Sequence, residues 1–199
     1  MSNWAAIEKG REMKNQKRLA IAAAVCACFA LAFPVLASAA VWKHKGVNVN
    51  KFVELGLPGG EIFESEISGE KSGMSCEVRA VMTTEGGSTA KITKYELKTC
   101  TKAFGKLSSC QINTQEAKGL PWTVHVNASD LTITNMRIRR TFKAGCVVSE
   151  YDKTFPSMTV VLNTPSAISE MEFNGSLVGY KAFGSWTVEG TNKGTYGIG

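Results

Sequence analysis

The chain has 199 residues, of which 44% are hydrophobic and 20% are charged, and its 23 Lys and Arg side chains outnumber its 17 Asp and Glu side chains. This composition is typical of a globular protein, and the length suits one domain of ordinary size. It excludes collagen, a long coiled coil, a disordered charged tail and a membrane protein with several helical spans.

Residues 1–39 have the pattern of a secretory signal peptide. Three basic residues between positions 14 and 18 precede an apolar run over residues 19–36, and the small residues Ala37-Ser38-Ala39 follow at the cleavage position. We therefore predict cleavage before Ala40 and a mature protein that is extracellular or part of the cell envelope. Both Met1 and Met13 remain possible as the start of translation.

Two other interpretations of this segment stay open. The apolar run approaches the roughly 20 residues that a membrane-spanning helix needs, although Pro34 argues against an uncleaved anchor. The second alternative is lipid attachment at Cys28.

Residues 1–39 carry five of the 23 basic and two of the 17 acidic side chains, so the remainder has a net charge of only +3. Such a small excess is weak evidence for nucleic acid, and we predict no nucleic-acid partner.

Residues 40–60 differ from the rest of the mature chain. Trp42 and Phe52 are mixed with several lysines, and the stretch ends in Leu57-Pro58-Gly59-Gly60. This pattern predicts an N-terminal arm or an edge strand. For Trp42 the sequence does not distinguish a core position from an exposed one.

Residues 61–199 form the predicted β domain, because hydrophobic residues recur with period two between turn-forming residues. Strands are expected at 62–67, 76–83, 90–99, 109–114, 122–126, 131–134, 136–142, 146–150, 158–162, 167–173, 177–180 and 185–189. A dozen short strands predict an all-β fold, either an antiparallel sandwich or a partly closed barrel. Trp122 is expected in its core and His125 on its surface.

Four cysteines remain after the predicted cleavage, and an even number in an exported domain indicates two disulfides. Of the three possible pairings we favour Cys100 with Cys110 and Cys76 with Cys146. Zinc is the weaker alternative, because no two of these cysteines have the close spacing of metal ligands. We predict no metal and no cofactor.

The search for catalytic residues finds no convincing signature, so the protein is predicted not to be an enzyme. Ser88 lies in a sequence that nearly matches the G-x-S-x-G motif, but residues 85–88 are better explained as a hairpin connection. Glycoside hydrolases use a pair of acidic side chains for catalysis. The pairs Glu64 and Glu66, and Glu170 and Glu172, are better explained as the solvent-exposed faces of two strands.

The most distinctive local feature is a group of basic residues within 137–143. Arg137, Arg139, Arg140 and Lys143 lie within seven residues. Guanidinium groups bind carboxylates and phosphates well, so this group is the candidate site for an anionic ligand such as a surface polymer. The alternative is a solvated strand face whose arginines pair with glutamates across the sheet.

The chain resembles a group of uncharacterised secreted bacterial β-rich proteins. The resemblance covers roughly Cys76 to Gly199, and it rests on the Leu120-Pro121-Trp122 strand start between the cysteines and on the Gly-rich end from Gly194. It implies an exported β domain and assigns no functional residues.

Together these observations predict a secreted or cell-surface, non-enzymatic binding or structural module. Its partner is expected to be a cell-surface polymer or a second copy of the chain. The alternatives are a carrier of a small apolar ligand, an extracellular hydrolase and a small membrane β-barrel, which needs longer strands than those predicted here.

Overall fold

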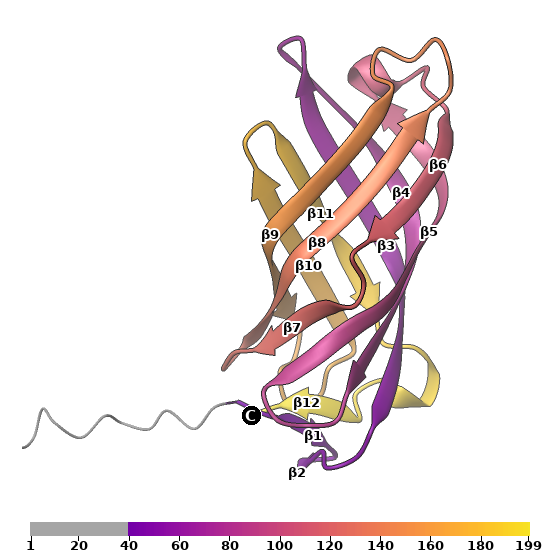
Figure 1. The fold of residues 1–199 in the computed structure, drawn as a ribbon. Coiled ribbons are helices and arrows are strands. Elements are labelled where there is room, and N and C mark those ends of the chain that lie inside the picture. The colour runs from indigo at the N-terminus through magenta and orange to yellow at the C-terminus, as the bar shows by residue number, and fades with distance from the viewer. Residues whose placement is uncertain (1–39) are drawn as a thin grey trace, which may run out of the picture. The chain divides into compact units, whose positions relative to one another are not determined.

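A computed structural model describes residues 40–199, so the predicted signal peptide lies outside the described residues. The described part consists almost entirely of β-strands (Figure 1). They are β1 (Trp42–His44), β2 (Val47–Asn48), β3 (Val53–Ile67), β4 (Glu70–Thr84), β5 (Thr89–Phe104), β6 (Ile112–Lys118), β7 (Trp122–Val126), β8 (Asp130–Phe142), β9 (Glu150–Leu162), β10 (Glu170–Leu177), β11 (Tyr180–Thr187) and β12 (Tyr196–Ile198). Two short 3-10 helices, η1 (Gly105–Leu107) and η2 (Gly190–Asn192), complete the elements of residues 40–199. In this part of the chain no helix has the length and apolar character needed to cross a membrane.

The main sheet is a closed antiparallel barrel. Its strands follow the order β8-β7-β5-β4-β3-β11-β10-β9, and pairing between β8 and β9 closes the ring. Strand β6 pairs with the second half of β8, while β7 pairs with the first half. The all-β prediction is therefore confirmed, and the barrel is the correct one of the two predicted architectures.

The barrel forms because inward and outward positions alternate along its strands. In β3, for example, Leu55, Leu57 and Phe63 are buried, whereas Glu54 is exposed. Trp122 is also buried, as predicted, and its indole Nε1 donates a hydrogen bond to the Lys118 carbonyl at 2.8 Å. Bulky buried side chains of this kind fill the barrel interior.

The strands are longer than predicted. Five of them have 13 to 16 residues, and β8 joins two segments that were predicted separately. The backbone of β8 continues through Asn135, which has a φ of 57° and lies between two regular cross-strand pairs with β9. A local irregularity inside a strand therefore looked like a strand end. The predicted strands at 146–150 and 177–180 are wrong, since the first is mostly loop and the second spans the turn between β10 and β11.

Residues 40–60, predicted as an arm or an edge strand, supply β1, β2 and the first part of β3, and β2 lies at the edge of its sheet. Strands β1 and β2 form a small sheet with β12, in the order β12-β1-β2, and Trp42 of β1 is fully buried. Strand β3 begins at Val53 and continues to Ile67, so residue 60 lies inside a strand and is not a boundary. The turn-like Leu57-Pro58-Gly59-Gly60 stretch fits in the strand partly because Gly59 packs against the backbone of Ser185, where a Cβ atom would clash.

All four cysteines within residues 40–199 form disulfides, but the predicted pairing is wrong. The bonds join Cys76 to Cys100 and Cys110 to Cys146. Cys76 and Cys100 face each other on the neighbouring strands β4 and β5, with their Cα atoms 3.9 Å apart. Strand β5 continues past Cys100 to Phe104, which removes Cys110 from the position expected for a local loop. Two disulfides are consistent with an oxidising compartment.

Candidate binding surface on strand β5

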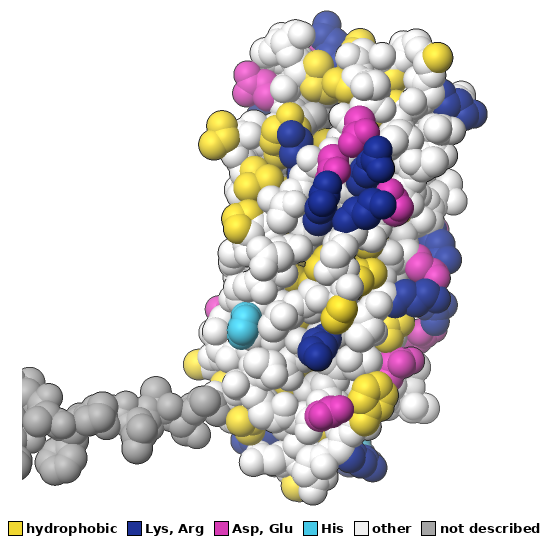
Figure 2. Space-filling model, in the orientation of Figure 1, with side chains coloured by type: hydrophobic (Ala, Val, Ile, Leu, Met, Phe, Trp, Pro, Cys, Tyr) yellow, Lys and Arg dark blue, Asp and Glu magenta, His cyan; other side chains and the backbone are white. Residues whose placement is uncertain are grey.

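The predicted arginine site is an ion-paired strand face. The Nε and Nη2 atoms of Arg137 donate hydrogen bonds of 2.8 and 2.6 Å to Asp152, and those of Arg139 donate bonds of 3.1 and 3.0 Å to Glu150. Figure 2 shows the resulting mixture of basic and acidic side chains over β8 and β9. The hydrogen bonds from Arg137 lower the pKa of Asp152. Cross-strand pairing is therefore found, although its carboxylates are not the glutamates considered from the sequence.

Arg140 does not belong to this face, because it points into the barrel. Its side chain is fully buried, and its Nη2 donates a 2.9 Å hydrogen bond to Glu61 Oε2, which also accepts a 3.1 Å bond from the Tyr95 hydroxyl. The guanidinium carbon lies 4.2 Å from the centre of the Phe63 ring. Arg140 lies two residues after the buried Ile138 on β8, so its side chain also points inward. The prediction that it meets a surface ligand is wrong.

Glu61, the partner of this buried arginine, was not predicted as a site residue. Glu61 is in phase with Leu55, Leu57 and Phe63 on β3, and that alternation was a usable signal of an inward carboxylate. Burial is the main cause that raises the pKa of Tyr95 well above its ordinary value. The cluster holds charge inside the barrel and has no exposed surface.

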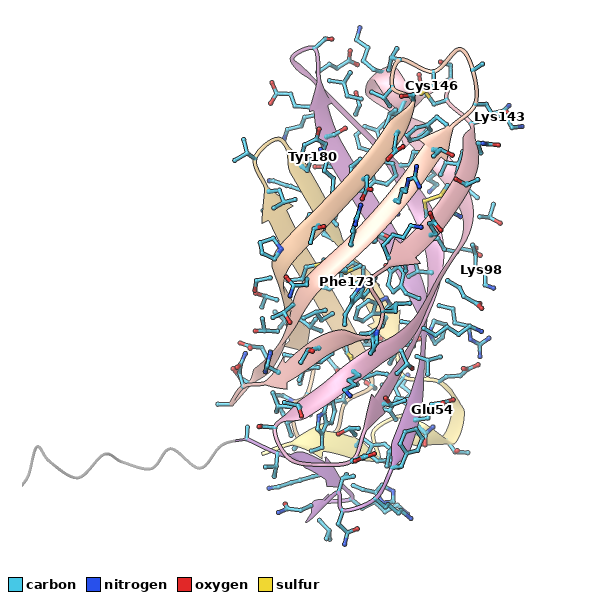
Figure 3. All side chains as sticks on the ribbon, viewed as in Figure 1. Glu54, Lys98, Lys143, Cys146, Phe173 and Tyr180 are labelled. Atoms are coloured by element: carbon cyan, nitrogen blue, oxygen red, sulfur yellow. A yellow bond between two sulfur atoms is a disulfide. The ribbon has the colours of Figure 1, made fainter. Side chains whose placement is uncertain are left out.

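Lys143, the last member of the predicted site, lies beyond the end of β8. Its Nζ donates a 3.0 Å hydrogen bond to Gln111 Oε1, in the loop before β6. Figure 3 shows Lys143 and Lys98 on the same side of the barrel. The structure thus separates Lys143 from the arginines and places it beside a different surface.

That surface is a groove between β5 and β6. Among residues 40–199, the upper half of β5 pairs only with β4, and the facing edge of β6 has no strand partner. Gln115 bridges the gap at one point, where its Nε2 donates to the carbonyls of Leu97 and Lys98. Beyond this bridge lies a cavity of about 780 Å³. Its lining is mainly polar: Met74, Lys98, Cys100, Thr101, Lys102, Ala103, Ser108, Cys110, Gln111, Ile112, Asn113 and Gln115.

The groove continues a row of lysines along β5, which we call the lysine row (Lys91, Lys94, Lys98 and Lys102). All four side chains are exposed. A bulge opposite Val81 and Met82 adds one residue to β5, so that Lys91 and Lys94 both stay on the outer surface despite their odd spacing. No ion pair involves Lys91 or Lys102 within residues 40–199.

Glu96 is the acidic residue in the middle of this row. It pairs with Lys94 at 2.5 Å and with Lys98 at 2.6 Å. Hydrogen bonds from these two ammonium groups lower the pKa of Glu96 from 4.5 to about 2. The row therefore carries four positive charges and one negative charge at neutral pH.

The other residues considered from the sequence do not form one site. Strand β11 separates Glu64 and Glu66 on β3 from Glu170 and Glu172 on β10. Residues 85–88 connect β4 to β5, as predicted, and His125 is exposed on β7, also as predicted. Among residues 40–199, no group of three His, Cys, Asp or Glu side chains has an arrangement that could hold a metal ion.

Comparison with known proteins finds no matching family model, no matching curated protein and no matching solved structure. The resemblance to secreted bacterial proteins therefore stays a prediction.

Proposed function

We propose that this protein is an exported, non-enzymatic binding module that holds an anionic surface polymer along β5. The observation that carries the proposal is the lysine row, which leads into a groove whose lining includes Lys98 and Lys102 and no acidic residue. The chemistry is the one predicted from the sequence, but the surface is β5 and not the arginine strand.

The geometry suits a linear ligand. Lys91 and Lys102 lie opposite Thr83 and Ser75 of β4, which are eight residues apart, so the row spans about 26 Å at roughly 3.3 Å per residue. Exposed lysines bind single anions weakly, because water solvates both charges. A polymer with repeated negative charges contacts several lysines at once, and these contacts reinforce one another since they share one chain.

Export supplies the setting for such a ligand. The two disulfides favour an oxidising compartment, and the predicted cleavage before Ala40 places the module outside the cytoplasm. We propose the cell envelope or the extracellular space as its location and a surface polymer as its partner.

The other predicted functions have less support. A carrier of an apolar ligand needs a cavity, whereas fully buried side chains such as Trp122, Trp186 and Phe173 occupy the barrel core. A membrane barrel has apolar residues outside and polar residues inside, and the alternation in β3 and β5 is the reverse. A glycosidase needs one desolvated acid in its pair, whereas Glu66, Glu170 and Glu172 are exposed and Glu64 is half-buried.

The test is the affinity of the oxidised protein for alginate and for polyphosphate, measured by calorimetry at low and at physiological salt. Lys98→Gln/Lys102→Gln should weaken the binding of both polyanions, and added salt should weaken binding by the unmodified protein. The matched control is Lys45→Gln/Lys181→Gln, which removes the same charge from exposed positions away from β5. Equal affinities for the two double variants would contradict the proposal.

A further inference from the structure

The lower end of the lysine row opens into a second hollow of about 460 Å³. The hollow lies beside the β4–β5 hairpin, where Lys91 starts the row. Its walls carry many hydroxyl groups: the lining residues are Phe52, Thr83, Thr84, Glu85, Gly86, Thr89, Ala90, Lys91 and Thr123. This combination of hydroxyls, one carboxylate and one ammonium group differs from the groove at the other end of β5.

Phe52 is the unusual member of this lining. Its side chain is 61% exposed, whereas the tryptophans described in the barrel and in the small sheet are buried. Exposed aromatic rings lose the stabilisation that burial provides, and single cases need no explanation. Here, however, the ring borders a polar hollow, where it offers a flat apolar surface beside hydrogen-bonding groups.

The hairpin beside this ring is held in place. Thr84 Oγ1 donates to the Thr89 carbonyl at 3.0 Å and accepts a 3.0 Å hydrogen bond from the Gly86 amide. Gly86 has a φ of 102° and packs against the Val49 carbonyl, where a Cβ atom would clash. The Thr84 hydroxyl is thereby occupied by the turn, and the hollow is bordered by a defined backbone.

We propose that this hollow binds one sugar ring of an acidic polysaccharide whose chain continues along the lysine row. The inference rests on the proposed function and names its ligand class. The apolar C–H face of a pyranose ring packs on Phe52. The Glu85 carboxylate accepts hydrogen bonds from sugar hydroxyls, and the Thr123 hydroxyl donates and accepts them. Lys91 meets the first acidic group of the polymer.

A single-stranded nucleic acid fits these observations less well. Sites for single strands stack successive bases on several aromatic side chains, whereas Phe52 is the aromatic residue that lines this hollow. The Glu85 carboxylate accepts hydrogen bonds from hydroxyl groups, which a pyranose ring carries around its rim. The hollow therefore favours a hydroxyl-rich ring.

The experiment compares Phe52→Ala with Phe52→Trp in the full oxidised protein, using alginate, polyphosphate and a single-stranded oligonucleotide as probes. Phe52→Ala should lose roughly tenfold in affinity for alginate, the effect of one good aromatic contact, with unchanged affinity for polyphosphate. Phe52→Trp should keep or improve alginate binding. The matched control is Val161→Ala, which truncates a 54% exposed apolar side chain on β9.

Three outcomes would overturn the inference: unchanged alginate binding by Phe52→Ala, an equal loss for alginate and polyphosphate, or a selective loss for the oligonucleotide. These results are distinct from a failure of the proposed function. That failure appears as unchanged binding of both polyanions by Lys98→Gln/Lys102→Gln, whatever the Phe52 variants do.

Discussion

At the scale of single residues, the clearest feature is the charge pair enclosed in the barrel. Arg140 and Glu61 are both fully buried, and only one guanidinium nitrogen and one carboxylate oxygen take part in their bond. Arg140 Nε and Nη1 and Glu61 Oε1 have no partner among the described residues. Removing two charges from water is costly. The folded protein is therefore less stable with this ion pair than it would be with two apolar side chains of similar size.

We predict that Arg140→Met destabilises the protein by about 3–5 kcal/mol, because it leaves the Glu61 carboxylate buried without a counter-charge. The double variant Glu61→Leu/Arg140→Met should recover most of this loss, because it removes both buried charges. Urea unfolding of the single and double variants measures the coupling. Arg137→Met, on the exposed face of the same strand, is the control and should unfold at nearly the urea concentration of the unmodified protein. A similar small effect for Arg140→Met would contradict the prediction.

At the scale of elements, β5 carries the candidate site. Glu96 lies in the middle of this strand, and the titration of its carboxyl group can be measured. Its pKa of about 2 lies below the ordinary value of 4.5. The lowered pKa means that its pairs with Lys94 and Lys98 stabilise the folded state fully above pH 4.5. This contribution is lost as the pH falls from 4.5 through 2.

We therefore predict a carboxyl titration midpoint near pH 2 for Glu96, measured by NMR. In Lys94→Gln/Lys98→Gln the midpoint should return toward 4.5, since both ammonium groups are gone. A midpoint near 4.5 in the unmodified protein would show that the two pairs do not form in solution.

The same residue leads to a prediction about binding. Glu96→Gln removes the one negative charge in the lysine row and releases Lys94 and Lys98 from their ion pairs. Affinity for polyphosphate should rise by roughly twofold to fivefold at low salt, and the gain should shrink at high salt because screening weakens it. Glu54→Gln, an exposed acid on β3, is the control for net charge. The prediction is wrong if the two variants behave alike.

Alternation predicted much of β5 but not its surroundings. The expected strand at 90–99 lies within Thr89–Phe104, and the turn at 85–88 was correct. A hairpin centred on Gly86 and Gly87 places Cys76 nearly opposite Cys100. The sequence therefore contained evidence for the first disulfide that the prediction did not use. Other features depended on the whole sheet. Bulges, the closure by β8 and β9 and the gap between β5 and β6 arise from pairing between distant segments, which a local pattern does not contain.

The second disulfide fastens the loops at the upper end of this groove. Cys110 and Cys146 are separated by 36 residues along the chain. On the loop-entropy argument, Cys110→Ser/Cys146→Ser should cost about 2–4 kcal/mol of stability. Cys110 lines the groove, and Gln111 beside it bonds to Lys143. Polyanion affinity should therefore fall as well, measured at a temperature where the variant is folded. Full affinity in the folded variant would place the ligand away from this end of β5.

At the scale of the whole molecule, strands from both ends of the described chain pair with one another, because β1 pairs with β12 in the small sheet and β3 pairs with β11 in the barrel. Such long-range pairing forms only after the last strands are available, and the four cysteines of residues 40–199 allow three alternative pairings before then. An oxidising compartment that permits reshuffling favours the pairing of Cys76 with Cys100 and of Cys110 with Cys146. This preference is consistent with the proposed export.

We predict that the protein isolated from its own host begins at Ala40 and gains about 4 Da on reduction, one hydrogen for each of four cysteines in two disulfides. Intact mass spectrometry with and without reductant measures both properties, and proteolysis without reductant identifies the linked peptides. A Cys76–Cys100 peptide and a Cys110–Cys146 peptide are expected. A mass that includes residues 1–39 would exclude cleavage and favour the anchor, and would place the lysine row beside a membrane surface instead of a free polymer. Unchanged mass on reduction would remove the argument for an oxidising compartment, and the proposed location would fail with it.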